Sequence, residues 1–391
     1  MSKQLENVVV VAYGRSAIAR SGKKGALREM HPVEMAGTVL AGVLKKVPQL
    51  DPALIEDVIL GCAIPEQKQG LNPGRLVATA AGLPDCVPGM TVDRFCSSGL
   101  QSIAIAAAQI ECGMNEILVA GGFESMTALP MTIDRSADVS PWLMENAPAA
   151  YLPMGLTAEN VAQRYGITRE EMDAFAVESH RRAAAAQDAG KSADEIIPLN
   201  GVDDEGKSIV FDQDQGIRRG TSMEALSQLK PCFKKTGVVT AATSSQTSDG
   251  AAFVVLMSES KAAELGVKPI ARFRGFAVAG CEAAYMGLGP MYAVPKVMEK
   301  TGLTVEQMDV IELNEAFAAQ AIPCIRELGL EPAKVNPNGG AIALGHPMGA
   351  TGAYLTCKAL GELKRTGGKY ALVTMCIGGG MGAAGIYEMM D

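Results

Sequence analysis

Aromatic side chains are scarce in this sequence. They account for 5% of the 391 residues and include one tryptophan, whereas 48% of the residues are hydrophobic and 43 are glycine. A core of this composition must be filled by aliphatic side chains and by close approach of helices to strands at small residues. The length favours two or three domain-sized units, and the hydrophobic content is sufficient for a large core.

A basic excess and a long apolar run are also missing. The formal net charge of −8 argues against nucleic acids and anionic membranes as partners, although a small anionic ligand needs only a local basic patch. The apolar stretch Val8 to Ala12 is too short for a signal peptide, and no stretch reaches membrane-spanning length. We therefore expect a cytoplasmic protein.

Paired cysteines are the third absence. The nine cysteines are an odd number without CxxC spacing or histidines at zinc-ligand spacing, so we expect neither a disulfide framework nor a metal site. Cys112, Cys324 and Cys357 lie in apolar helical stretches, where we expect small buried hydrophobic residues. A reactive cysteine must then lie in a distinctive local setting.

Short β-branched runs alternate with alanine-rich stretches, which is typical of a parallel-stranded α/β fold. The predicted strands are Val8–Val11, Val58–Leu60, Gly89–Val92, Ile117–Ala120, Ile270–Val278, Val310–Glu312, Val335–Gly339 and Tyr370–Thr374. The predicted helices are Pro32–Val43, Leu100–Cys112, Pro290–Thr301, Ala316–Leu328 and Thr351–Lys364.

The order of these elements repeats. In the first half, a strand is followed by a turn with Cys96, a helix, a second strand and Gly121-Gly122. In the second half, a strand is followed in the same order by a turn with His346, a helix, a second strand and Cys376–Gly380. This duplication predicts two pseudosymmetric halves whose reactive residues meet at the seam between them.

The stretch from about 123 to 240 has a different texture. It contains Trp142, many Met and Pro residues, and a charged helix from Thr168 to Ala189 that begins with a capping pattern. We expect an inserted domain that covers the site.

Cys96 and His346 have settings that suit chemistry. Cys96 lies between a strand and a helix, where backbone N–H groups and the helix dipole favour a thiolate and can stabilise an oxyanion. His346, in an apolar glycine-rich segment, could take a proton from a thiol or donate to an oxyanion. The alternatives are a buried structural cysteine and a core histidine. The other histidines, His31 and His180, are predicted to be surface residues.

Cys376 supplies a second thiol in a glycine-rich turn. Acyl transfer needs one thiol, whereas a Claisen condensation or its reverse uses a second thiol to move an α-proton. A thiol can do this because its ordinary pKa of ~8.5 is close enough to neutrality when the site stabilises the anion. Asn314 could cap a helix or hold a water in an oxyanion hole, and the residues alone leave both open.

Gly380–Gly385 matches GxGxxG, but the sequence ends six residues later, without the helix and acidic residue of a dinucleotide site. We therefore reject a nicotinamide or flavin cofactor.

Together, four segments resemble the thiolase family: Asp93–Gly99, Asn314–Phe317, Gly345–Gly349 and Cys376–Gly380. The resemblance covers essentially the whole chain. It implies a five-layered αβαβα fold, with one half at 1–122 (completed by about 241–268), a CoA-binding loop domain at 123–240, and the other half at 269–391. It also implies a homotetramer that needs no cofactor and uses CoA and acyl-CoA as substrates.

The same resemblance implies roles for individual residues. Cys96 matches the acylated nucleophile, His346 the histidine that activates it, and Cys376 the acid/base cysteine. Asn314 matches an asparagine that positions a water in one oxyanion hole, and the N–H groups of Cys96 and Gly378 match the second hole. The resemblance also implies CoA contacts at Arg218, Ser245, Met154 and Phe317. The guanidinium of Arg218 suits the nucleotide phosphates.

Residues 312–315 and 244–250 resemble the degradative 3-ketoacyl-CoA thiolases, and 151–155 lacks the histidine that acetoacetyl-CoA thiolases carry before the methionine. The segment Tyr13–Ala17 departs from the family pattern but keeps Arg15.

The expected reaction is the reversible cleavage of 3-oxoacyl-CoA in fatty acid β-oxidation, and the resemblance allows for a β-oxidation partner enzyme. The alternative is an acetyl-CoA C-acetyltransferase. A ketoacyl synthase would need a histidine in place of Cys376, and a protein that only binds acyl-CoA would lack one of the three reactive residues.

Overall fold

A computed structural model describes residues 5–131 and 136–390 of the chain. Its main sheet has the strand order β10-β11-β12-β9-β1-β8-β5-β3-β4, with β2 paired to β8. The strands are β1 (Val8–Arg15), β2 (Ala19–Arg20), β3 (Asp57–Gly61), β4 (Gly89–Val92), β5 (Ile117–Ser125), β8 (Ser248–Ser258), β9 (Ala271–Gly280), β10 (Val310–Leu313), β11 (Tyr370–Ile377) and β12 (Met381–Met389). A separate hairpin is formed by β6 (Leu199–Val202) and β7 (Ser208–Phe211).

The sequence pattern is typical of a parallel-stranded fold, but the sheet is mixed. Among the strands of the described residues, only the pairs β3/β4, β3/β5 and β10/β11 are parallel. The turn between β11 and β12 is only three residues long, and a connection that short can join only antiparallel neighbours. Gly379 and Gly380 have φ of 81° and 89°, a left-handed conformation that favours glycine.

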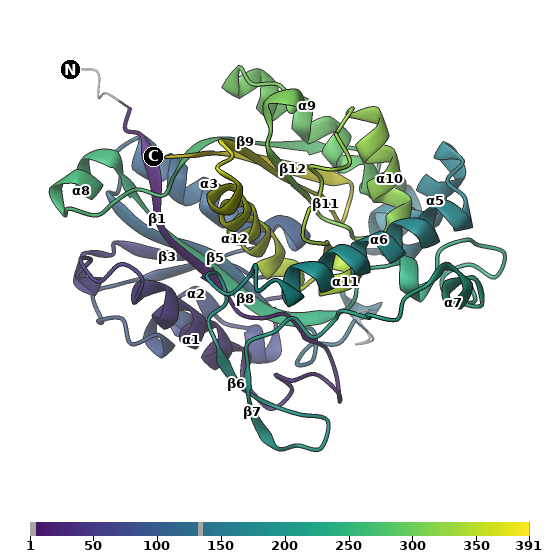
Figure 1. The fold of residues 1–391 in the computed structure, drawn as a ribbon, viewed down its shortest axis with the longest axis horizontal. Coiled ribbons are helices and arrows are strands. Elements are labelled where there is room, and N and C mark those ends of the chain that lie inside the picture. The colour runs from purple at the N-terminus through teal and green to yellow at the C-terminus, as the bar shows by residue number, and fades with distance from the viewer. Residues whose placement is uncertain (1–4, 132–135, 391) are drawn as a thin grey trace.

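The helices lie in layers around this sheet (Figure 1). α1 (Pro32–Leu44) and α2 (Pro73–Ala80) cover one outer face, and α9 (Gly289–Thr301) and α10 (Ala318–Glu327) cover the other. Between the two halves of the sheet lie α3 (Ser98–Glu111) and α12 (Met348–Thr366). Three hydrophobic clusters fill the spaces between these layers.

Glycine lets the two central helices touch at their first turns. A Cβ on Gly99 would lie 2.8 Å from the carbonyl oxygen of Gly349, and one on Gly352 would lie 2.3 Å from the amide nitrogen of Leu100. Such distances leave no room for a side chain at either glycine. Because Cys96 and His346 lie just before these two helices, this contact brings the two turns together.

The remaining helices are α4 (Pro141–Asn146), α5 (Met154–Tyr165), α6 (Arg169–Asp188), α7 (Met223–Ser227), α8 (Glu259–Glu264) and α11 (Ala341–Leu344). The predicted capping pattern is confirmed, because Thr168 and Glu171 form a reciprocal capping box at the start of α6. Within the described ranges, no helix has both the length and the apolar character needed to span a bilayer.

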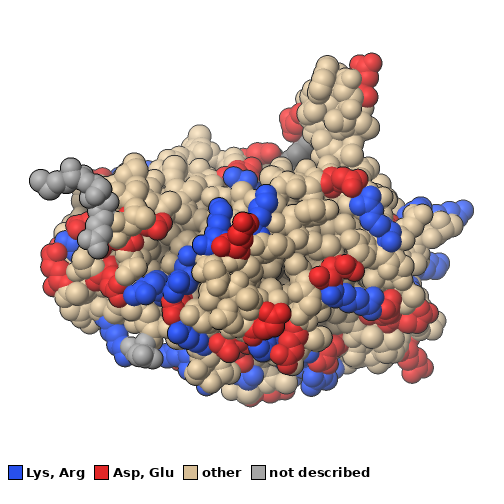
Figure 2. Space-filling view, turned by 90° about the horizontal axis from the view of Figure 1, so that it is seen from above, with Lys and Arg blue, Asp and Glu red and all other residues tan. Residues whose placement is uncertain are grey.

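Buried charges connect residues 195–214 to the sheet. Arg15, at the end of β1, is 1% exposed and donates hydrogen bonds to Asp214 at 2.8 and 3.0 Å and to Glu195 at 3.1 Å. Arg15 of the atypical 13–17 segment therefore anchors a distant part of the chain. On the face seen in Figure 2, acidic and basic side chains are interspersed over the surface.

Two local expectations are wrong. Val335–Gly339 is not a strand: Val335 makes an isolated bridge to Ile311, and the positive φ of Asn336 (45°) and Gly339 (76°) breaks the extended backbone. Cys112 is exposed because it lies at the C-terminal end of α3, whereas Cys324 and Cys357 are buried as expected.

Candidate active site

Cys96 lies in a tight turn (Phe95–Ser97) between β4 and α3 and is 8% exposed. The turn is held locally: Phe95, with φ of 44°, donates its N–H to the Asp93 carboxylate at 2.7 Å, and Ser98 Oγ accepts the N–H of Arg94 at 2.8 Å. Burial raises the pKa of Cys96 to about 11, while the backbone N–H groups of Gly378 and of Cys96 itself hydrogen-bond the sulfur and oppose that rise. These N–H groups are placed to stabilise negative charge beside the sulfur.

Cys376 is fully buried near the end of β11. Burial raises its pKa well above the ordinary value, and the neighbouring Cys96 raises it further. The effect of Cys96 on the ionisation of Cys376 places the two thiols close together, and the Cys96 turn packs against β11. The Cα of Gly378 faces Met154 and Phe95: a Cβ there would lie 3.6 Å from each side chain.

His346 lies between α11 and α12 and is 7% exposed. Its backbone N–H donates to the carbonyl of Gln246 at 3.0 Å. On the imidazole, Nδ1 is 2.7 Å from Thr351 Oγ1 and Nε2 is 3.4 Å from Asn314 Nδ2. Burial lowers the pKa of His346 to about 4, so the ring is neutral near pH 7 and available as a proton acceptor.

Asn314 does not cap the helix that follows it. That helix, α10, begins at Ala318 with Phe317 as its N-cap residue. Asn314 is fully buried after β10, its N–H donates to the carbonyl of Thr374, and its Oδ1 has no hydrogen-bond partner among the described residues. The free carbonyl oxygen and the amide nitrogen near His346 suit a group that orients a water or a substrate.

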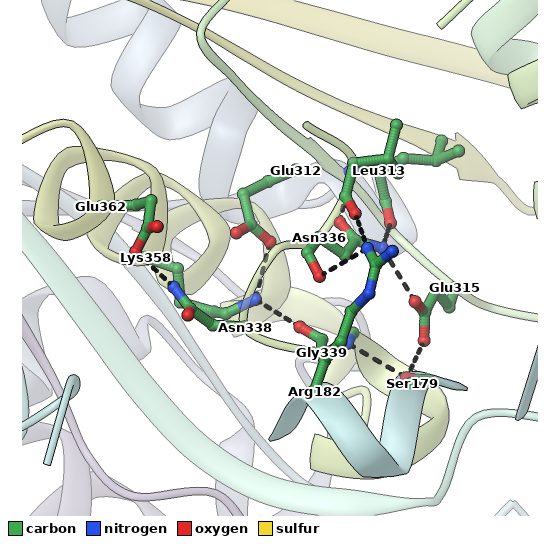
Figure 3. Close-up of polar contacts among 12 residues, drawn as sticks. Ser179, Arg182, Glu312, Leu313, Glu315, Asn336, Asn338, Gly339, Lys358 and Glu362 are labelled. Carbon is green, nitrogen blue, oxygen red and sulfur yellow. Dashed lines mark hydrogen bonds and ion pairs between the residues drawn. The ribbon is translucent and has the colours of Figure 1, made fainter. Parts of the chain in front are cut away.

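The backbone around Asn314 is fixed by Asn336 (Figure 3). The Asn336 side chain accepts the N–H of Leu313 at 2.9 Å and donates to the carbonyl of Leu313 at 2.8 Å and to Glu315 at 2.9 Å. Glu315 in turn accepts hydrogen bonds from Ser179 Oγ at 2.7 Å and from the N–H of Ile342 at 3.2 Å. This network links the Asn314 segment to the loop that leads to His346.

A buried ion pair reinforces the same link. Lys358 on α12 donates to Glu312 on β10 and to the carbonyl of Gly339, both at 2.7 Å (Figure 3). No role was predicted from the sequence for Glu312, Glu315, Asn336 or Lys358. The available signal was that Glu312, Glu315 and Lys358 are charged residues in apolar segments.

Comparisons with known proteins identify the family and the fold. The thiolase N-terminal domain matches residues 8–260, and the thiolase C-terminal domain matches residues 267–389. The chain belongs to the thiolase family. The five-layered thiolase fold expected from the sequence is confirmed.

Similar thiolases carry two different names. A 3-ketoacyl-CoA thiolase of Bacillus subtilis (strain 168) is 47% identical, with 98% of this chain and 100% of the relative covered. An acetyl-CoA acetyltransferase of Allochromatium vinosum is 44% identical, with 98% and 100% covered. The crystal structure of the Bacillus anthracis acetyl-CoA acetyltransferase superposes with a TM-score of 0.91 at 41% identity, covering 100% of both chains.

The four residues expected to contact CoA in this thiolase lie on four segments of the chain, two of which are joined by a backbone hydrogen bond. Met154 begins α5 beside Gly378, and Phe317 packs edge-on against Phe233 with ring centroids 6.0 Å apart. The N–H of Ser245 donates to the carbonyl of Ala316 at 2.9 Å, next to Phe317. Arg218 is exposed on a separate loop.

Gln246 ties the Arg218 loop to the His346 segment. Its Nε2 donates to the carbonyls of Gly216, Ile342 and Ala343 at 2.9–3.1 Å, while its own carbonyl accepts the His346 N–H. This role of Gln246 was not predicted, because no local pattern in the sequence indicates it.

The prediction that His180 is a surface residue is wrong. His180 is 5% exposed, and its Nδ1 accepts the N–H of Arg218 at 3.1 Å. The charged neighbours of His180 on α6 suggested exposure, but the face of the helix that carries it packs on the Arg218 loop. Burial lowers the pKa of His180 to about 4. His31 caps α1 by accepting the N–H of Val33 at 3.3 Å.

The glycine-rich stretch Gly380–Gly385 enters the strand β12 rather than a helix. A dinucleotide fingerprint places its phosphates at a helix N-terminus, so this segment has the wrong architecture for one. In the part of the chain that the structure describes, no group of three His, Cys, Asp or Glu side chains could hold a metal ion.

Proposed function

We propose that this thiolase cleaves 3-oxoacyl-CoA with CoA to give acetyl-CoA and an acyl-CoA shortened by two carbons. The observation that carries the proposal is the pairing of two buried thiols, Cys96 and Cys376, with the N–H of Gly378 at the Cys96 sulfur. The helix that follows the neutral His346 packs against the Cys96 turn. One thiol suffices for acyl transfer, so the second supports carbon–carbon cleavage or formation. CoA acts as a substrate, and the steps require no metal or redox cofactor.

In the first half-reaction Cys96 attacks the 3-keto carbon while His346 takes its proton. The resulting oxyanion would be stabilised at the water or donor position beside Asn314 and His346. The bond between C2 and C3 breaks, its electron pair stays on C2 as the enolate of acetyl-CoA, and Cys376 supplies the proton. The acyl group remains on Cys96 as a thioester.

In the second half-reaction the CoA thiol attacks the Cys96 thioester. Cys376, now a thiolate, takes the CoA proton, and the expelled Cys96 sulfur regains its proton from His346. Both cysteines return to their starting states, so the cycle balances as a ping-pong reaction. The N–H groups of Cys96 and Gly378 face the Cys96 sulfur and support the thioester oxyanion.

The second candidate is an acetyl-CoA C-acetyltransferase that condenses two acetyl-CoA. It is favoured by the acetyltransferase names of similar proteins. The degradative assignment is supported by the name of the Bacillus subtilis relative and by Leu152 and Pro153, which precede Met154 without a histidine. Thiolysis rates with 3-oxoacyl-CoAs of four, eight and sixteen carbons separate the two: a substantial rate at eight or sixteen carbons supports the first, and activity confined to four supports the second.

The residue that carries the acyl group is identified by mass spectrometry of peptides from protein incubated with acyl-CoA. We expect the acyl group on Cys96 and its release by added CoA, with Cys112→Ala, at an exposed cysteine, behaving as the parent. An unlabelled Cys96 in a protein that turns over would contradict the proposal. The homotetramer and a β-oxidation partner enzyme remain predictions, which light scattering and co-purification can test.

A further inference from the structure

The imidazole of His346 contacts a side chain at each of its two nitrogens. Asn314 lies 3.4 Å from Nε2, and Thr351 Oγ1 lies 2.7 Å from Nδ1. Thr351 is fully buried in the first turn of α12, five residues after His346. The chain leaves His346, passes Pro347 and enters the helix, which returns the Thr351 hydroxyl to the far side of the ring.

Among the described residues, the hydroxyl of Thr351 has His346 Nδ1 as its single hydrogen-bond partner. Most buried helical hydroxyls donate to a carbonyl one turn earlier, as Thr356 does to Gly352 at 2.9 Å on the same helix. Thr351 makes no such bond within the described residues, and His346 Nδ1 is its one side-chain partner there. A hydroxyl can either donate or accept, so it satisfies Nδ1 in either tautomer of the neutral ring.

When His346 takes the Cys96 proton, both ring nitrogens carry protons, and each needs an acceptor in a site that excludes water. Histidines in this role are often paired with a carboxylate. Here burial lowers the pKa of His346, and among the described residues the hydrogen-bond partners of the ring are an amide and a hydroxyl rather than a carboxylate. The ionisable groups on the surrounding elements include Glu124 on β5, which accepts the N–H of Gly349, Asp249 on β8, Glu315 after β10, the ion pair of Glu312 with Lys358, and the thiols Cys96 and Cys376.

We propose that Thr351 is the positioning residue of His346: its hydroxyl accepts the Nδ1 proton of the imidazolium formed when Cys96 is deprotonated. A neutral acceptor stabilises this cation without adding a permanent negative charge next to the thiolate or to the acyl-CoA thioester. The inference rests on the proposed role of His346 as the base for Cys96.

Three variants isolate the hydroxyl. Thr351→Val keeps the shape and removes the acceptor, Thr351→Ser keeps the acceptor, and Thr356→Val removes a buried hydroxyl of the same helix that does not contact His346. Leaving a charged donor unpaired lowers kcat by about 10- to 100-fold in Thr351→Val, with KM changed by less than about threefold. Thr351→Ser should retain most of kcat, and Thr356→Val should keep kcat near the parent value.

The decisive readout needs no CoA substrate. Iodoacetamide alkylation of Cys96, followed on its own peptide by mass spectrometry, reports the pH at which the thiolate forms. The alkylation rate rises with pH as the thiolate forms, and in Thr351→Val this rising limb should move up by about one to two pH units. Thr351→Ser and Thr356→Val should keep the limb of the parent. If Thr351→Val does not fold, Thr351→Ala carries the same prediction.

A limb in Thr351→Val or Thr351→Ala that coincides with the parent would overturn the inference, as would a Thr351→Ser limb shifted as far as that of Thr351→Val. His346→Ala separates this failure from failure of the proposed mechanism. If removing the imidazole leaves the limb in place, His346 is not the base for Cys96 and both proposals fall. If His346→Ala shifts the limb and Thr351→Val does not, only the role of Thr351 is lost.

Discussion

The turns that carry Cys96 and His346 occupy equivalent places in the two halves of the fold, but they are held differently. The Cys96 turn is fixed by residues within its own segment, chiefly Asp93 and Ser98. The His346 turn has a local contact to Thr351 but is otherwise fixed from a distance: Gln246 accepts its N–H, Asn314 contacts its ring, and Glu124 accepts the N–H of the nearby Gly349 at 2.9 Å.

This difference corresponds to a difference in task. The nucleophile needs a thiol next to its own backbone N–H groups, which a local turn provides. The histidine must be aligned with Asn314 and with a thiol from the other half of the fold, so its position depends on contacts between elements. Changes at distant partners should therefore disturb His346 more than changes within the Cys96 turn disturb Cys96.

The largest effect is expected from the nucleophile itself. Cys96→Ala removes the atom that carries the acyl group, so thiolysis should fall by about 10⁴-fold or more. The rate is measured by the loss of 3-oxoacyl-CoA absorbance, with Cys112→Ala as the exposed-cysteine control. Parent-like turnover by Cys96→Ala would remove Cys96 from the mechanism.

The next effect tests the long-range contacts of the histidine side. Asn336→Ala breaks the hydrogen bonds to Leu313 and Glu315 that fix the Asn314 segment, so we expect a loss of about 2–4 kcal/mol in unfolding free energy and about 10- to 100-fold in kcat. Asn338→Ala is the matched control, because Asn338 is also buried but bonds Glu362 and Lys191 instead. Equal losses of kcat in both variants would show that the network does not act through Asn314.

The pH dependence of stability gives a smaller effect. The pKa of His346 and of His180 is lowered to about 4 from an ordinary 6.5, so between these values the unfolded chain binds protons that the folded protein does not. Stability should therefore fall as the pH decreases from about 6.5 to about 4, with a slope of up to about 1.4 kcal/mol per pH unit for each histidine. Urea unfolding at several pH values measures this slope, and His180→Gln should reduce it; an unchanged slope would contradict the burial of His180.

The smallest effect is expected in the Cys96 turn. Ser98→Ala removes one acceptor for the Arg94 N–H, while the bond from Phe95 to Asp93 remains. We expect a loss of about 1 kcal/mol in unfolding free energy and a change of less than about threefold in kcat. A kcat loss larger than that of Asn336→Ala would reverse the comparison between the two turns.

The sequence predicted what is local. Most strands and helices, the capping box of α6 and the turn at Cys96 follow from periodicity and from capping or turn residues that are close in sequence. The antiparallel pairing of β11 with β12 and the loss of a strand at 335–339 depend on backbone reversals at Gly379, Gly380 and Asn336 that periodicity does not reveal.

The scaffold of the site was not predictable in the same way. Asn336, Gln246 and Lys358 act across 23, 100 and 46 positions on Leu313, His346 and Glu312. No local pattern encodes such pairs, because they exist only after the two halves of the fold pack together. The same reason explains His180, whose charged neighbours suggested a surface position.

The most direct test of the mechanism is the location and fate of the acyl group in Cys376→Ala. After prolonged incubation with octanoyl-CoA, the peptide of Cys96 should carry the acyl group in both the parent and the variant, because Cys96 alone holds the thioester; the variant should acylate more slowly, since this step is the reverse of release by CoA. Added CoA should release it rapidly from the parent and slowly from the variant, because Cys376 takes the CoA proton. An acyl group on any other cysteine, or equally rapid release from both proteins, would contradict the assigned roles of Cys96 and Cys376.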